Sequence, residues 1–347
     1  MEREGLHKHL DLSLEPAMLD SISSSLLRTI GAVSSLVGAL KPTILCFHSV
    51  RPGPVGADGF VSSLSVSSGL IQSLVVRLRV LNVPVLSLAD AVKRISAGDR
   101  SPFVVLTFDD GYVDNYTALF PVMLRYRAPF TIFLTSGLID GVVPLWWDAL
   151  ERLEADRSAR RKLRLTGEQD DSLASPNTLR EHFRDASPHQ QQKMLERLIA
   201  NKNEAAEQWK SGVLDWSQIR EMLNSGLLTV GAHSVHHPVL SRLGPETIRL
   251  ELEQSRRRIE QETGTSVRFF AYPYGQDSEV GVEAPAIARA LGFDAAFTTE
   301  GRPITGPDMN QMFALPRVLL SSKVEHADHA LAYVSGQPAS IKRWIGR

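Results

Sequence analysis

Two short segments of this chain carry side chains that can hold a metal ion and move a proton. The sequence TFDDG at residues 107–111 ends one apolar run, and HSVHH at residues 233–237 follows another. One carboxylate with two imidazoles is a ligand set that holds a catalytic zinc ion and leaves a position open for water. A second carboxylate beside the first can accept a proton during hydrolysis. Together the two segments predict metal-assisted hydrolysis of a substrate.

The acidic pair Asp109 and Asp110 has a plainer explanation, because Asp-Gly between apolar runs is also typical of a hairpin turn. Residues 112–124, however, have the pattern of a helix rather than that of a returning strand. In a parallel barrel, the carboxyl ends of the strands form the catalytic face. Adjacent residues that leave a strand point in different directions, so one aspartate can bind a metal while the other faces the attacking water.

The histidines at positions 233 and 237 are four residues apart, so they lie on the same side of a helical or turn-like segment. A single histidine is more often a core or surface residue than a ligand. Two at this spacing, with an acidic pair after another strand, favour a metal site instead. We expect His236 to point away from that site, into a packing contact. Ser234 can orient a ligand through a further hydrogen bond.

Two other segments can contribute to the same site. The sequence RFFAYPYG at residues 268–275 is a strand followed by a turn, which is either plain barrel structure or a source of functional groups. In the second case the turn offers a backbone N–H to a developing oxyanion, and its aromatic faces suit a sugar ring. His48 ends the predicted strand 43–47 and therefore lies on the same rim, although on its own it is equally a core residue.

Short apolar runs alternate with helical patterns from residue 43 onward, which predicts an α/β fold with a parallel sheet, most simply a barrel. The predicted strands are 43–47, 83–86, 103–108, 130–135, 228–232, 268–272, 295–298 and 315–319. The predicted helices between them include 68–81, 115–126, 245–263 and 284–291.

The 347 residues fit one barrel domain over residues 43–320, since α/β barrels reach this size as a single unit. Residues from about 145 to 215 are highly charged and lack strand-like runs, which predicts a helical insertion. The insertion is either a lid or flank over the site or a solvated helical excursion. We expect a helical segment over residues 1–42 and a terminal helix or tail over residues 321–347.

Composition narrows the class of protein. A net charge of −1 lacks the excess of positive charge that is typical of proteins that bind nucleic acid. The single cysteine, Cys46, excludes an intrachain disulfide and favours a reducing compartment, so we expect a cytoplasmic protein. The segment before the apolar stretch 30–40 contains several acidic residues, whereas a signal peptide begins with a short basic segment. We therefore expect an amphipathic helix over residues 18–40. Peripheral contact of this helix with a membrane stays open, and so does the oligomeric state.

TFDDG, HSVHH and YPYG, in this order along the chain, resemble the polysaccharide deacetylases of carbohydrate esterase family 4, the nodulation-factor deacetylase fold. The resemblance covers roughly residues 43–320, apart from the insertion. It implies a distorted (β/α)7-type barrel that hydrolyses the N-acetyl group of N-acetylglucosamine units. It also implies that Asp109 is the general base, that Asp110, His233 and His237 are metal ligands, and that the backbone N–H of Tyr274 helps to hold the oxyanion.

The chain departs from the commonest pattern of that family at two points. Ala271 stands where many members carry an arginine that tethers the base, and no Leu-x-His motif near the C-terminus supplies the usual acid. The chain is similar to the branch of poly-N-acetylglucosamine deacetylases, which share FAYPYG and an early strand that ends in histidine. By this resemblance His48 becomes the expected acid, with His326 and His329 or water as alternatives. Arg317 at the end of another strand becomes the expected tether.

The function predicted from the sequence is removal of N-acetyl groups from a bacterial oligo- or polysaccharide in exopolysaccharide or lipid-linked glycan biosynthesis. Zinc is the expected cofactor, although nitrogen and oxygen ligands also suit Co²⁺, Ni²⁺ or Mn²⁺. The expected partner is the N-acetylated glycan itself. Two alternatives stay open: a deformylase or other C–N hydrolase of the same fold, and a non-catalytic carbohydrate-binding protein with a vestigial site.

Overall fold

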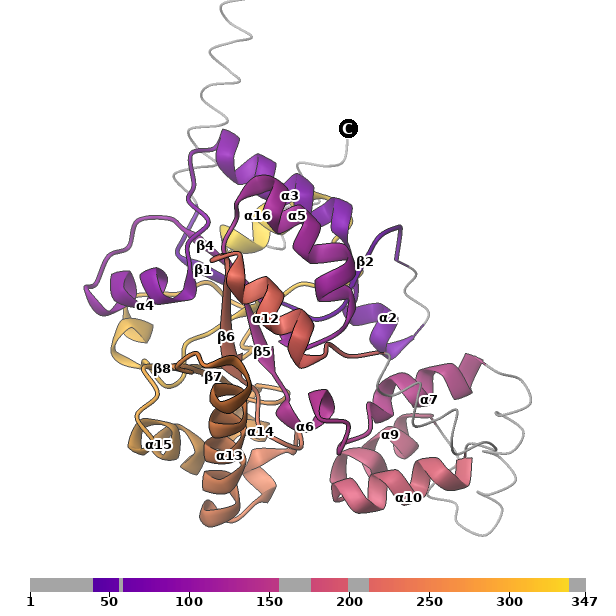
Figure 1. Ribbon diagram of the computed structural model, residues 1–347. Helices are drawn as coiled ribbons and strands as arrows, with labels where there is room; N and C mark the ends of the chain where they lie inside the picture. The colour runs from indigo at the N-terminus through magenta and orange to yellow at the C-terminus, as the bar shows by residue number, and fades with distance from the viewer. Residues whose placement is uncertain (1–39, 56–58, 156–175, 199–211, 337–347) are drawn as a thin grey trace, which may run out of the picture. The chain divides into compact units, whose positions relative to one another are not determined.

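The computed structural model describes residues 40–55, 59–155, 176–198 and 212–336 (Figure 1). The chain divides into two compact units, residues 1–39 and residues 40–347, and everything below concerns the second. The predicted helix over residues 18–40 lies outside the described residues except for Leu40. Among the described helices, none combines the length and the apolar character that crossing a membrane requires.

Seven parallel strands form a curled sheet in the order β8-β7-β6-β5-β4-β1-β9, with helices around it. Their bounds are β1 Thr43–Phe47, β4 Val104–Asp110, β5 Phe130–Leu134, β6 Leu228–Ala232, β7 Phe269–Ala271, β8 Ala295–Phe297 and β9 Val318–Leu319. A separate small sheet pairs β2 Val50–Arg51 with β3 Val66–Ser67. The predicted α/β class and distorted barrel are therefore confirmed. Both faces of the central strands are covered, which is why they are continuous apolar runs in the sequence.

Two predicted strands are interrupted at a proline in the structure. The segment 83–86 makes only one bridge, between Val85 and Val104. Its Pro84 has no N–H to donate, which limits the ladder to that point. The segment 315–319 is divided in the same way by Pro316: Leu315 bridges Phe297, and only Val318–Leu319 forms β9.

The larger helices pack around the sheet and follow the predicted pattern closely. They are α3 Ser68–Val80, α4 Leu88–Ser96, α5 Phe120–Tyr126, α12 Trp216–Asn224, α13 Pro245–Thr263, α15 Glu283–Ala290 and α16 Ala327–Val334. Helix α13 begins at a proline and ends at Gly264, whose φ of 65° suits a glycine cap. The predicted helix 115–126 begins as a π-helix, η1 Asn115–Leu119, before α5.

Short helices fill the connections between these elements. They are α2 Phe60–Leu64, α6 Ser136–Ile139, α14 Asp277–Val280 and the 3₁₀ turns η3 Leu240–Arg242 and η4 Pro307–Asn310. Inside the curled sheet, a core cluster joins strand residues such as Val105, Phe133 and Phe297 to Leu88 and Ile95 of α4.

The insertion between β5 and β6 is helical, as its charged sequence predicts. Its described helices are α7 Trp146–Ala155, α9 Pro176–Asp185 and α10 Pro188–Leu198, which lie together at the lower right of Figure 1. The insertion shares an apolar cluster with the barrel, in which Trp147 and Phe183 lie with Tyr112 and Leu138. It therefore packs against the body of the protein through a buried face and is not a solvated excursion.

Candidate functional site

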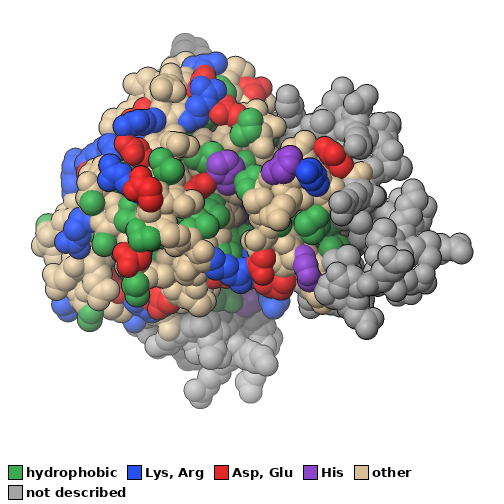
Figure 2. Space-filling model, turned by 90° about the horizontal axis from the view of Figure 1, so that it is seen from below, with side chains coloured by type: hydrophobic (Ala, Val, Ile, Leu, Met, Phe, Trp, Pro, Cys, Tyr) green, Lys and Arg blue, Asp and Glu red, His purple; other side chains and the backbone are tan. Residues whose placement is uncertain are grey.

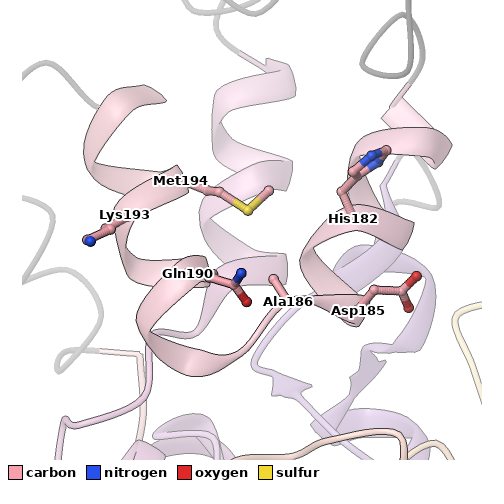
Figure 3. Close-up of a pocket in the computed structure, with 6 residues that line it drawn as sticks. All are labelled: His182, Asp185, Ala186, Gln190, Lys193 and Met194. Atoms are coloured by element: carbon pink, nitrogen blue, oxygen red, sulfur yellow. The ribbon is translucent and has the colours of Figure 1, made fainter. Parts of the chain in front are cut away.

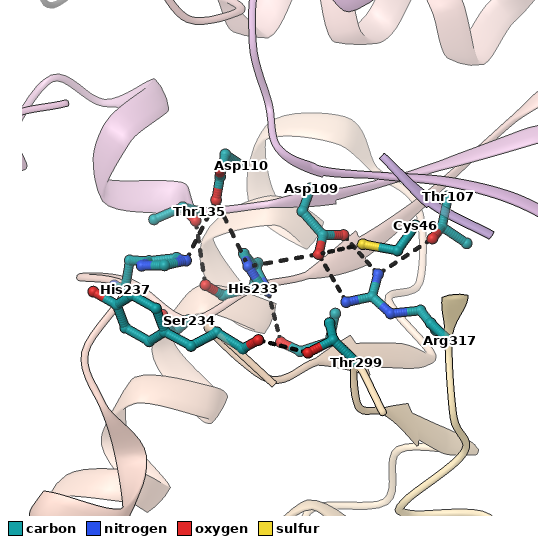
Figure 4. Close-up of polar contacts among 12 residues, drawn as sticks. Cys46, Thr107, Asp109, Asp110, Thr135, His233, Ser234, His237, Thr299 and Arg317 are labelled. Atoms are coloured by element: carbon teal, nitrogen blue, oxygen red, sulfur yellow. Dashed lines mark hydrogen bonds and ion pairs between the residues drawn. The ribbon is translucent and has the colours of Figure 1, made fainter. Parts of the chain in front are cut away.

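The structure brings the predicted site residues together where β1, β4, β6 and β7 end (Figure 4). The strands are parallel, so their carboxyl ends meet at one edge of the sheet. Two groups of side chains form there. The metal side is Asp110, His233 and His237, and the base side is Asp109 with Arg317, Thr107 and Cys46.

The three residues of the metal side converge on one carboxylate oxygen. Oδ1 of Asp110 lies 3.6 Å from Nε2 of His233 and 3.4 Å from Nε2 of His237. Metal bonds of 2.0–2.2 Å in a tetrahedral arrangement place the ligand atoms about 3.3–3.6 Å apart. That Oδ1 atom is buried and has no hydrogen-bond partner among the described residues. The three side chains therefore fit a divalent metal ion.

Protonation of the metal side also suits a cation. Burial raises the pKa of Asp110 well above its ordinary value, and the neighbouring charge of Asp109 raises it further. Burial lowers the pKa of His233 and lowers that of His237 strongly. Both imidazoles are thus neutral and able to ligate, and a bound cation would favour the ionised form of Asp110.

The two histidines are held in different ways. Nδ1 of His233 lies 2.7 Å from the carbonyl oxygen of Ala271, which turns Nε2 toward Asp110. The backbone N–H of His237 donates to Oγ of Ser234 at 2.9 Å. Nδ1 of the His237 ring, however, is buried without a partner. Ser234 therefore orients the loop, while the His237 ring has no hydrogen bond from Nδ1 to a described residue.

Glu251 of α13 holds the histidine loop, and the sequence analysis missed it. Its carboxylate accepts the backbone N–H groups of Val235 and His236, each at 2.9 Å, and it lies 2.5 Å from Nδ1 of His236. This hydrogen bond raises the pKa of His236. His236 does point away from the ligands, but into an ion pair rather than an apolar contact. The available signal was an acidic residue next to Leu252 on the apolar face of a predicted helix.

The base side is an ion pair with two parallel hydrogen bonds. Nη1 and Nη2 of Arg317 donate to Oδ1 and Oδ2 of Asp109, each at 2.7 Å. Arg317 is fully buried and also donates to Oγ1 of Thr107 and to the carbonyl of Thr298, each at 3.2 Å. Burial alone would raise the pKa of Asp109, but the guanidinium outweighs it and holds that pKa well below its ordinary value. Arg317 thus occupies the tether position that Ala271 cannot fill.

Cys46 adds a third donor to the base side. Its Sγ lies 3.4 Å from Oδ2 of Asp109, and burial raises the pKa of the thiol well above its ordinary value. A ring nitrogen of His48, the sulfur of Cys46 and a carboxylate oxygen of Asp109 lie within 4.8 Å of one another. Because Arg317 already engages both oxygens of Asp109, this second group does not fit a metal. A lone cysteine in an apolar strand does not by itself predict this contact with Asp109.

His48 lies beside the base, as its place at the end of β1 predicts. Asn115 of η1 donates to the carbonyl of His48 at 2.9 Å, so the π-helix fixes this loop. Burial lowers the pKa of His48 to about 4, so its imidazole is neutral at pH 7. His326 and His329, the alternatives, belong to the α16 region beside α3, at the opposite end of Figure 1 from α6 and α14.

Backbone strain is concentrated at this site. Of the six non-glycine residues with positive φ among the described residues, four are Asp110, Ser234, His237 and Tyr274. Such conformations cost about 1–3 kcal/mol each and gather where function demands them. Tyr274 has a φ of 61°, and its backbone N–H has no partner among the described residues. An unpaired N–H in a strained turn is available to a developing oxyanion.

A separate pocket of about 380 Å³ lies between α9 and α10 (Figure 3) and contains none of the predicted site residues. Its lining is His182, Asp185, Ala186, Gln190, Lys193 and Met194. Asp185 pairs with Arg242 of η3, which ties the pocket's wall to the barrel. Figure 2 views the molecule from below, and on the described part of this face acidic and basic side chains are interspersed rather than gathered into one charged patch.

The fold and the site together define an α/β barrel with an Asp, His, His group at the carboxyl ends of its strands. A family model for polysaccharide deacetylases matches residues 97–159 and 178–296, which together make up more than half of the chain. The chain therefore belongs to the polysaccharide deacetylase family. The resemblance inferred from three motifs is confirmed, and the interval between the two matched segments falls within the insertion.

Individual relatives are more distant. The protein YxkH of Bacillus subtilis is 22% identical over 218 residues, which are 63% of this chain and 51% of YxkH. The chain thus matches about half the length of this curated relative. The Streptococcus pyogenes deacetylase PplD, solved in complex with acetate, has a TM-score of 0.58 at 17% identity over 85% of this chain and 98% of PplD. IcaB from Ammonifex degensii has a TM-score of 0.55 at 20% identity over 85% and 97% of the two chains. These structures share the fold.

Proposed function

We propose that this protein is a metal-dependent hydrolase that removes N-acetyl groups from N-acetylglucosamine-type units of a bacterial oligo- or polysaccharide. The observation that carries the proposal is the contrast between two adjacent carboxylates. Asp109 is held ionised by Arg317, whereas Asp110 faces two neutral imidazoles. One strand end thereby offers a proton acceptor and a metal ligand side by side. Membership of the polysaccharide deacetylase family supports the same chemistry.

Asp110, His233 and His237 would hold the metal, for which we propose zinc, with Co²⁺, Ni²⁺ or Mn²⁺ able to replace it. Such an ion supplies Lewis-acid polarisation of the acetamide carbonyl and a water of lowered pKa. Asp109, ionised and fixed by two hydrogen bonds, accepts the proton of the attacking water. The N–H of Tyr274 donates to the carbonyl oxygen as negative charge develops on it.

The departing amine needs a proton, and we propose that His48 delivers it. With a pKa of about 4, its side chain is a neutral imidazole at pH 7 and not an imidazolium that could donate a proton. It lies within 4.8 Å of Asp109, which has just accepted the proton of the attacking water. His48 therefore acts as a relay between Asp109 and the amine rather than as a resident acid.

Arg317 also bears on the alternative of a vestigial site. The missing arginine at position 271 and the missing late acid histidine are the two features that favour a vestigial site. A fully buried guanidinium that makes two 2.7 Å hydrogen bonds to Asp109 replaces that tether. Burying a charge is costly unless it is paired. A buried ion pair of this kind is therefore easier to explain in an active site that uses Asp109 as a base than in a vestigial site.

The direct test is mass spectrometry of N-acetylated chitooligosaccharides, and of lipid-linked amino sugars, after incubation with zinc-loaded protein. We expect the loss of one acetyl unit, with Asp109→Asn as the matched inactive control. Turnover of N-formyl but not N-acetyl substrates would favour the deformylase instead. Binding of the glycan without any mass change, in protein that contains metal, would favour the carbohydrate-binding alternative. The place of the reaction in exopolysaccharide or lipid-linked glycan synthesis follows from which substrate is consumed.

A further inference from the structure

His237 lacks the support that metal-binding histidines ordinarily have. Such a residue almost always donates its second ring N–H to a carboxylate, carbonyl or water, which fixes the tautomer and orientation of the ring. His233 follows this rule through Ala271. Nδ1 of His237 is buried and has no partner among the described residues. Among the described residues, packing contacts rather than a hydrogen bond are therefore what the His237 ring meets.

Aromatic rings surround His237. The centre of its imidazole lies 5.0 Å from the Trp147 ring, with an angle of 50° between the planes. Tyr274 lies 4.7 Å away at 65° and His233 lies 5.0 Å away at 64°. Separations of about 4.5–7 Å are those at which aromatic pairs attract each other. Packing on Trp147 and Tyr274 can therefore do what a hydrogen bond does for His233.

Trp147 is itself fixed in place. Its Nε1 donates to the hydroxyl of Tyr112 at 2.7 Å, and only 5% of the residue is exposed. Trp146 meets it edge to face at 5.2 Å. Tyr112 belongs to the loop that follows Asp110, so this hydrogen bond connects the indole to the segment that carries another ligand. The indole is therefore connected to the loop that follows Asp110 as well as to the His237 ring.

The insertion that carries Trp147 is tied to the rim of the site at two further points. Glu151 of α7 accepts the backbone N–H groups of Val61 and Ser62 at the start of α2. The guanidinium of Arg184 in α9 lies 4.4 Å from the centre of the Tyr274 ring and pairs with Glu279. The contact between Trp147 and His237 is therefore supported by attachments on both flanks.

We propose that Trp147 is a positioning residue for His237, so that the helical insertion forms part of the metal site. The indole holds the imidazole in the orientation that presents Nε2 to the ion, in place of the absent hydrogen bond. The inference rests on the proposed role of His237 as a ligand. It assigns to the insertion a task that its charged sequence does not suggest, since Trp147 brings an aromatic ring of the insertion into contact with a proposed ligand.

The test is the zinc dissociation constant of the full-length apoprotein, measured by competition with a chromogenic chelator. We expect Trp147→Ala to bind zinc about tenfold more weakly, the effect typical of removing a group that orients a ligand. Trp147→Phe keeps an aromatic face against His237, and we expect its affinity to stay within about threefold of wild type. Tyr112→Phe, which frees the indole N–H, should fall between these two variants.

Trp146→Ala is the matched control, because Trp146 stacks on Phe183 at 5.5 Å and makes no ring contact with His237. It should lower the melting temperature of the apoprotein much as Trp147→Ala does, without weakening zinc binding. Wild-type zinc affinity in Trp147→Ala would overturn the proposal, and so would an equal loss of affinity in Trp146→Ala. Failure of the wild-type protein itself to bind zinc would instead contradict the proposed function.

Discussion

The base side and the metal side of the site lie on neighbouring residues of one strand, yet they differ in how completely their polar atoms are paired. Both oxygens of Asp109 accept hydrogen bonds from Arg317, and Cys46 adds another. On the metal side, Oδ1 of Asp110 and Nδ1 of His237 are buried without partners. An unpaired buried polar group costs about 1–3 kcal/mol. The polar atoms of the base side are therefore paired within the protein, whereas the metal side leaves Oδ1 of Asp110 available to a cation.

The same contrast separates two aspartates that are identical in chemistry. Arg317 holds the pKa of Asp109 below its ordinary value, while burial and the charge of Asp109 raise that of Asp110. The strand places their side chains in different directions, so each meets a different set of neighbours. The surroundings of these two adjacent carboxylates thus give them different pKa shifts, which suit the proposed roles of proton acceptor and metal ligand. Each prediction below changes one of the two aspartates or a residue in their surroundings.

Removal of Asp110 should have the largest effect. Asp110→Ala takes away the ligand on which both imidazoles converge, so we expect it to lose both bound metal and turnover. Metal content by elemental analysis and deacetylation by mass spectrometry measure the two losses. In the wild type, chelation should abolish turnover and added zinc or cobalt should restore it. Full activity of a rigorously metal-free preparation would contradict the assignment.

Asp109→Asn should separate the two sides of the site. The amide cannot accept the proton, so we expect a loss of about 10²–10⁴-fold in kcat. The metal content should stay that of the wild type, since no ligand is changed. If the variant instead emptied the metal site, the roles of Asp109 and Asp110 would have to be exchanged. A kcat within about threefold of wild type would remove Asp109 from the mechanism.

His48→Ala should retain the metal and lose about 10²-fold in kcat, the lower end of the range for proton transfer. His48→Gln should do little better, because an amide can form a hydrogen bond but cannot pass on a proton. With a pKa of about 4, His48 is neutral throughout the working range, so the shape of the pH–rate profile should not change above about pH 6. A wild-type kcat would return His48 to a structural role and favour water as the proton donor.

Arg317→Met should change the pH dependence and the stability of the base side. The guanidinium lowers the pKa of Asp109 in the folded protein, so the pair stabilises the fold above the unfolded pKa of about 3.9, and this contribution is lost as the pH falls through the folded value. Without Arg317, burial raises that pKa, and the acid limb of the pH–rate profile should move to higher pH. At pH 7 the free energy of unfolding should fall by about 3–5 kcal/mol in denaturant titrations.

Arg317→Met combined with Asp109→Asn is the control for that experiment. The double variant has no unpaired buried charge, so it should be more stable at pH 7 than Arg317→Met alone. If the single and double variants unfold at the same denaturant concentration, the ion pair does not govern the stability of the base side.

Much of this site was predictable because its residues lie at the ends of strands. Local apolar patterns define where β1, β4 and β6 end, and parallel pairing brings those ends together. Arg317 was expected as the tether from the family resemblance, but it directly precedes β9, which pairs with β1, instead of ending a strand. The predicted strand 83–86 was wrong because Pro84 limits it to one bridge, although its apolar pattern suits a strand.

The supporting residues could not be predicted, because their roles depend on contacts between distant segments. Glu251 lies on a helix whose sequence shows only an apolar face with one acidic residue on it, and nothing local shows which loop that face covers. Trp147 lies in an insertion whose position against the barrel follows from side-chain packing rather than from strand order. The contact of Cys46 with Asp109 depends on the register in which β1 pairs with β4, and the local sequence does not give that register.

The smallest predicted effect concerns Glu251, which acts on the metal side from outside the ligand set. Glu251→Gln keeps the volume and one oxygen, but a neutral amide accepts two backbone N–H groups less strongly and no longer attracts the His236 proton. The histidine loop should then hold His237 less firmly, and zinc should bind up to about tenfold more weakly, with kcat at saturating zinc near that of the wild type.

Chelator competition measures the zinc affinity. Glu253→Gln, which neutralises a neighbouring acidic residue of the same helix, is the matched control. An unchanged zinc affinity in Glu251→Gln would contradict this prediction, and would show that packing by Trp147 and Tyr274 alone orients the ligands. The three hydrogen bonds to Glu251 would then stabilise the loop without affecting metal binding.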